Sequence, residues 1–155
     1  MNMTIMKTLE YPLVALTLTE AECDFIMAPV LAGGLPRAGI CRNIPRSVLY
    51  GSLDHQGLGM HNLYTTMGLQ QIQVLLDNKW KDTVTGQLIR TSLESFKLEL
   101  GIQGALFSKD YDLYSDIATD FWIKHSWHFV QEHNIEIDED TNSGELLRAG
   151  DRFLG

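Results

Sequence analysis

The sequence GGLPRAGICRNIPRSVLYGSLDHQGLGMHN, residues 33–62, divides the chain into helical blocks. It contains Pro36, Pro45 and six of the thirteen glycines. Glycine tolerates positive φ and proline fixes φ at about −65°, so both residue types interrupt regular structure. The segments on either side have the apolar spacing of helices. We therefore predict a Pro/Gly-rich irregular hinge over residues 33–62.

The helix before the hinge should begin at Thr19. Thr19 and Glu22 have the spacing of a capping box, in which each side chain bonds the backbone N–H of the other residue. Pro29 should kink or shorten this helix, and Gly33 and Gly34 should end it.

Three further helices are predicted after the hinge, each from a cap residue followed by an apolar stripe. They are 63–76 after Asn62, a helix from Asp82 or Thr83 that ends at Gly101, and 116–133 after Ser115, with a loop over 103–114. The alternation in 135–137 could form a short strand, 138–143 reads as an acidic turn, and 145–153 could form a last short helix.

The fold class expected is an all-α multi-helix bundle. With 155 residues, 45% hydrophobic and 21% charged, the chain has the composition of a globular protein and the length of one domain. We predict a single helical domain over residues 1–155.

The net charge of −8 is unevenly distributed. Residues 1–60 carry four bases and five acids, whereas residues 61–155 carry eight bases and fifteen acids. Globally this disfavours nucleic-acid binding, which needs a basic surface. Locally, residues 36–50 contain Arg37, Arg42 and Arg46 and no acid.

The expected location is cytoplasmic or nuclear, with no membrane partner. No apolar run approaches the roughly 20 residues of a membrane span, and the start lacks the basic cap and apolar run of a signal peptide. Cys23 and Cys41 lack metal-ligand spacing and read as reduced, buried thiols.

No catalytic centre, metal site or cofactor is predicted. His125 and His128 share a helix face, but an H-E-x-x-H pattern is absent. An acidic cluster lacks the glycine and terminal glutamate of a calcium loop, and there is no G-x-S-x-G elbow. This cluster consists of Asp110, Asp112, Asp116 and Asp120.

Residues 35–68, LPRAGICRNIPRSVLYGSLDHQGLGMHNLYTTMG, resemble the region just after the polymerase core of retroelement (non-LTR, LINE-like) reverse transcriptases. In that family the helical thumb leads into a G-L-G-(apolar)-x-N/D-L motif, matched here by residues 57–63. The resemblance covers residues 9–76, which would be thumb-like, and continues more weakly over a helical extension at 77–155.

The chain departs from the family in lacking the palm motif Tyr-x-Asp-Asp. The nearest string, residues 114–117, has only one acid, Asp116. Two-metal phosphoryl transfer needs paired carboxylates to hold the ions. The resemblance therefore implies a fragment of a larger RNA-directed DNA polymerase that is not an enzyme by itself.

In its parent polymerase, the fragment would help to hold the template–primer duplex. Arg37, Arg42 and Arg46 are the expected phosphate-binding residues, because guanidinium groups can fork onto phosphate. They could instead cap helix ends or pair with Glu20, Glu22 and Asp24. The alternative function is a non-enzymatic helical module that binds a protein partner through its acidic C-terminal half.

Overall fold

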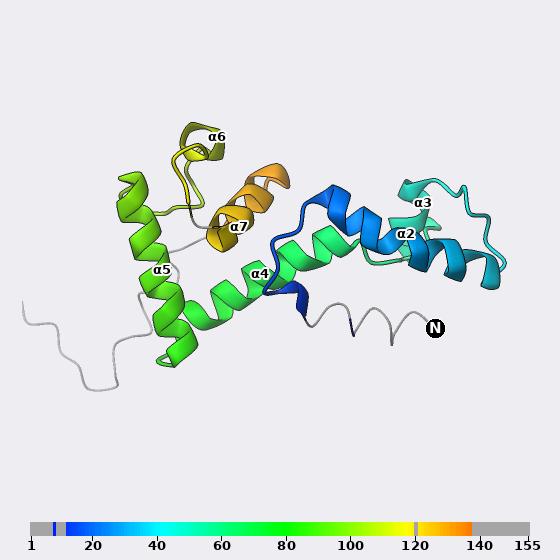
Figure 1. The fold of residues 1–155 in the computed structure, drawn as a ribbon, viewed down its shortest axis with the longest axis horizontal. Helices are drawn as coiled ribbons and strands as arrows, with labels where there is room; N and C mark the ends of the chain where they lie inside the picture. The colour runs from blue at the N-terminus through cyan, green and yellow to red at the C-terminus, as the bar shows by residue number, and fades with distance from the viewer. Residues whose placement is uncertain (1–7, 9–11, 120, 138–155) are drawn as a thin grey trace, which may run out of the picture. The chain divides into compact units, whose positions relative to one another are not determined.

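The computed structural model describes residues 8, 12–119 and 121–137. Within these residues the chain is all-α and has no strand, which confirms the predicted fold class (Figure 1). It divides into two compact units, Met1–Ile72 (unit 1) and Gln73–Gly155 (unit 2). The elements are α2 (Glu20–Arg37), α3 (Arg46–Tyr50), the 3-10 helix η1 (Leu53–His55), α4 (Leu63–Lys79), α5 (Val84–Leu100), α6 (Tyr111–Tyr114) and α7 (Phe121–Glu132).

The start of α2 is the predicted capping box. The Thr19 hydroxyl accepts a hydrogen bond from the Glu22 N–H at 3.3 Å, and the Glu22 carboxylate accepts one from the Thr19 N–H at 2.8 Å. These two bonds satisfy backbone donors that a helix otherwise leaves without partners.

The end of α2 differs from the prediction, because the helix continues through Pro29, Gly33 and Gly34. It ends in a Schellman motif, with Gly39 at φ 74° and hydrogen bonds from the Gly39 N–H to the Pro36 carbonyl and from the Ile40 N–H to the Leu35 carbonyl. Pro29 lies on the exposed side, where water can satisfy the carbonyl that loses its donor. Residues 33–62 are thus less irregular than predicted, since they also contain α3 and η1.

Asn62 caps α4 as predicted. Its side-chain oxygen accepts from the N–H groups of Tyr64 at 2.9 Å and Thr65 at 3.3 Å. The helix ends at Lys79, three residues later than the sequence indicated. Its buried apolar side chains are Leu63, Tyr64, Met67, Ile72 and Leu75, whereas Leu76, the last residue of the predicted helix, is exposed.

Both ends of α5 match the prediction. Thr83, one of the two expected start residues, accepts a hydrogen bond from the Gly86 N–H at 3.1 Å. Gly101 follows the last residue with φ 66°, and the Ile102 N–H bonds the Lys97 carbonyl at 2.9 Å. Leu93, Phe96 and Leu100 form the buried stripe.

The prediction that Ser115 caps a helix over 116–133 is wrong. Ser115 instead follows α6, a short helix inside the expected loop, whose cap is Asp110. The Lys124 ammonium group donates to the carbonyls of Ser115 and Ala118, which holds residues 115–118 in a turn before α7. No strand forms at 135–137. The acidic turn at 138–143 and the helix at 145–153 lie outside the described residues.

The core of unit 2 is built around Trp127. This side chain is fully buried, and its ring packs edge-on against Phe96 and Tyr111. Its indole N–H donates to the Lys109 carbonyl at 3.1 Å, so the ring also fixes the segment that leads into α6.

Candidate nucleic-acid interface

The three arginines lie on consecutive parts of unit 1. Arg37 is the last residue of α2, Arg42 lies in the turn that follows, and Arg46 is the first residue of α3. All three are exposed. The Schellman motif at Gly39 reverses the chain between Arg37 and Arg42, so both side chains extend from a fixed backbone.

Arg46 is the arginine with a defined acidic partner. Its guanidinium donates to the Asp24 carboxylate of α2, and this is one of the pairings that the sequence left open. The hydrogen bond and the charge of Asp24 raise the pKa of Arg46 above its usual value. Part of its positive charge is therefore neutralised by a neighbour, which weakens Arg46 as a phosphate ligand.

Arg37 and Arg42 have no ion pair or hydrogen bond from their side chains to any residue that the structure describes. Neither has an acid close in sequence, because residues 36–50 contain none. Their charges are thus free to meet an anion, and Arg42 also borders a pocket between α2 and α3.

The G-L-G segment holds α3 in place, a role that sequence reasoning missed. The N–H groups of Leu58 and Met60 donate to the Val48 and Leu49 carbonyls, at 2.8 and 3.1 Å, and so satisfy the C-terminal end of α3. At Gly57 a Cβ would lie 2.1 Å from the Gly51 carbonyl oxygen, so this close crossing requires glycine. The glycines at 57 and 59, close after residues 46–50, were the sequence signal that could have indicated this close backbone crossing.

The histidines of α7, and His133 just after it, are engaged in local contacts. His128 and His133 each lie beside Glu132, with ring nitrogen to carboxylate distances of 3.8 and 3.9 Å, and His133 stacks on Phe129. His125 also has an interaction within the structure. Among the described residues, no group of three His, Cys, Asp or Glu side chains is arranged to hold a metal ion.

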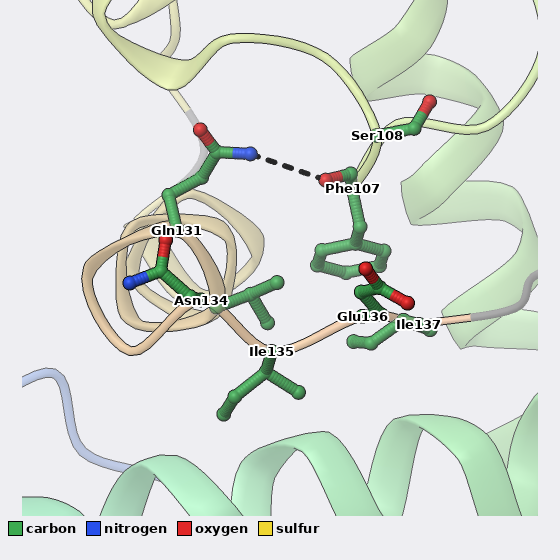
Figure 2. A pocket seen from close by; sticks show the side chains of 8 residues that line it. Phe107, Ser108, Gln131, Asn134, Ile135, Glu136 and Ile137 are labelled. Carbon is green, nitrogen blue, oxygen red and sulfur yellow. Dashed lines mark hydrogen bonds between the residues drawn. The ribbon is translucent and has the colours of Figure 1, made fainter.

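A pocket of about 370 Å³ in unit 2 lies between α7 and the segment before α6 (Figure 2). The Gln131 amide spans it to donate to the Phe107 carbonyl at 3.3 Å. Glu136 is the one ionisable side chain in its lining, and it is exposed. A single exposed carboxylate provides no acid–base pair, so this pocket does not resemble a catalytic site.

No protein-family model matches the chain, and no curated protein or solved structure matches it. No helix in the described part of the chain has the length and apolarity needed to cross a membrane.

Proposed function

We propose that the chain is a non-catalytic part of a retroelement reverse transcriptase, comprising the thumb and the helical region after it, and that it helps to hold the template–primer duplex. The observation that carries the proposal is the pair Arg37 and Arg42. Both are exposed and have no acidic partner in the described structure, and they lie on either side of the Schellman motif that ends α2.

The proposed contact is with the phosphate backbone. Guanidinium groups bind phosphate in a forked geometry, and such contacts position a duplex without reading its sequence. Arg46 contributes less, because Asp24 already occupies its guanidinium. The rest of the parent polymerase would supply the palm carboxylates. A cytoplasmic or nuclear location agrees with Cys23 and Cys41 being free thiols.

Binding of a fluorescently labelled duplex, measured across salt concentrations, tests this function. Two phosphate contacts predict a slope of log K against log salt of about −1.8. The double variant Arg37→Gln, Arg42→Gln should abolish most of that slope, while Arg46→Gln should change it little. Equal effects of all three substitutions, or no binding at low salt, would contradict the assignment.

The alternative function, a helical module that binds a protein partner, is favoured by a different observation. Four large apolar side chains are more than 60% exposed on α2 and α5, namely Phe25 on α2 and Val84, Leu88 and Leu98 on α5. In the same titration such a module would show no duplex binding even at low salt.

A further inference from the structure

A pocket of about 270 Å³ lies in unit 1 between α2 and the segment that leads into α3. Ala28 and Ala32 are one turn apart on α2 and leave the space that larger side chains would fill. Leu31 and Leu35 form the rest of that wall, and Ile44 and Leu49 form the opposite wall. These six lining side chains are all aliphatic.

Charged groups surround this aliphatic pocket. Arg42, Arg46 and Asp24 complete its lining, and Arg46 and Asp24 are paired with each other. The guanidinium of Arg42 is consequently the free charge at the pocket, and it is positive. A ligand that enters here should carry an apolar group next to an anionic group.

The apolar surface continues outside the pocket. Phe25 precedes Ala28 by three residues and Ala32 by seven, so all three share one stripe of α2. The Phe25 side chain is 81% exposed. An occupant of the pocket would thus also cover an exposed aromatic ring.

The chemistry of the lining distinguishes between anionic occupants. Recognition of an unstacked nucleobase also needs hydrogen bonds to the base edges. The one acceptor side chain in the lining, Asp24, is already bound to Arg46. The volume is below the roughly 300 Å³ at which pockets for drug-sized ligands begin, which suits one amino-acid side chain.

We propose that this pocket takes a large apolar side chain from an acidic segment of a partner polypeptide, with Arg42 pairing with a carboxylate beside that side chain. Charge complementarity determines the choice of partner: residues 36–50 carry three arginines and no acid. This proposal goes beyond the proposed duplex binding, and the two sites share Arg42.

The test measures fluorescence anisotropy of a labelled peptide, acetyl-Asp-Glu-Leu-Glu-Asp-amide, with the full chain. Saturable binding is expected, and replacing the peptide leucine with serine should weaken it about tenfold or more, because the apolar anchor is lost. Ala28→Leu, which fills the pocket from an exposed helix position, should weaken binding to a similar extent. Arg42→Gln should weaken binding and reduce its salt dependence.

Ala21→Leu is the matched control, since Ala21 is exposed on α2 but does not line the pocket. Equal effects of Ala21→Leu and Ala28→Leu would overturn the proposal, as would equal affinity for the leucine and serine peptides. Loss of duplex binding in Ala28→Leu would assign the pocket to nucleic acid instead. Loss of self-association in Ala28→Leu, measured by sedimentation, would assign it to a second copy of the chain.

Discussion

The hydroxyl group of Thr19 has two functions at the start of α2. It accepts from the Glu22 N–H, and it also donates to the Glu22 carboxylate at 2.8 Å. The backbone and hydroxyl bonds from Thr19 lower the pKa of Glu22, because both favour the ionised carboxylate. One short side chain therefore fixes both the start of the helix and the charge near its positive end.

Replacing Thr19 with alanine should lower the free energy of unfolding by about 1 kcal/mol, the usual effect of losing a cap. Urea denaturation at neutral pH measures the change. Thr19→Ser keeps the hydroxyl and is the control, and a loss as large as that in Thr19→Ala would show that the methyl group, rather than the cap, was responsible.

Cys23 and Cys41 should differ in reactivity. Cys23 is buried, and its burial, followed by the charges of nearby acids, raises its pKa from 9.0 to about 11, whereas Cys41 is exposed. Iodoacetamide at pH 8 should therefore label one thiol in the folded chain and two in urea, as counted by mass spectrometry. Rapid double labelling of the folded chain would contradict the buried position of Cys23.

The raised pKa of Cys23 also makes the free energy of unfolding depend on pH in the alkaline range. Because the folded-state pKa of Cys23 is raised, its protonated form contributes stability that is complete below about pH 9 and is lost as the pH rises through about 11. Cys23→Ala should remove this part of the alkaline loss of stability, which thermal melts at pH 8 and pH 10.5 would reveal.

At the scale of elements, glycines with different surroundings should respond in opposite ways to alanine. Gly33 lies inside α2 with no atom within 4 Å of an added Cβ, so Gly33→Ala should raise the free energy of unfolding by about 0.5–1 kcal/mol. Gly57→Ala places a Cβ on the Gly51 backbone and should cost about 1–3 kcal/mol.

Thermal melts of the two glycine variants measure this contrast. Gly57→Ala should also weaken duplex binding, because the G-L-G segment holds the end of α3, and α3 follows the turn that contains Arg42. Stabilisation by both substitutions would indicate that residues 57–60 do not close onto α3.

Helix ends were predictable where a few neighbouring residues decide them. Thr19, Asn62 and Gly101 were identified correctly, and Thr83 was one of two candidates, because each cap depends on hydrogen bonds within five residues. The break between α6 and α7 was missed, because Lys124 stabilises it from nine residues away and Trp127 packs against the segment before it. The continuation of α2 past Gly33 and Gly34 was missed, because the glycine with positive φ that ends the helix is Gly39.

The candidate site was predictable only where neighbouring residues in the sequence define it. Its arginines follow from the local composition of residues 36–50. The pairing of Arg46 with Asp24 joins residues 22 apart, and no short-range pattern selected Asp24 over Glu20 or Glu22. The pocket beside Arg42 depends on how α2 faces α3, which residue spacing does not specify.

At the scale of the whole molecule, the distribution of carboxylates bears on catalysis. Two-metal phosphoryl transfer needs paired carboxylates that hold ions about 4 Å apart. In this chain Asp110 accepts a hydrogen bond as the cap of α6, and Asp116 has no second acid beside it in sequence. Among the residues that the structure describes, no three His, Cys, Asp or Glu side chains are arranged to hold a metal ion.

The full chain should accordingly fail to extend a primer. With a labelled primer–template, deoxynucleotides and either Mg²⁺ or Mn²⁺, products should not exceed those of a reaction without protein. The same preparation should still bind the duplex at low salt. This control distinguishes a lack of catalysis from a failure to bind the primer–template. Primer extension could instead rise with protein concentration and persist in a repurified sample. Carboxylates outside the described residues would then complete a metal centre, and the non-catalytic assignment would have to be abandoned.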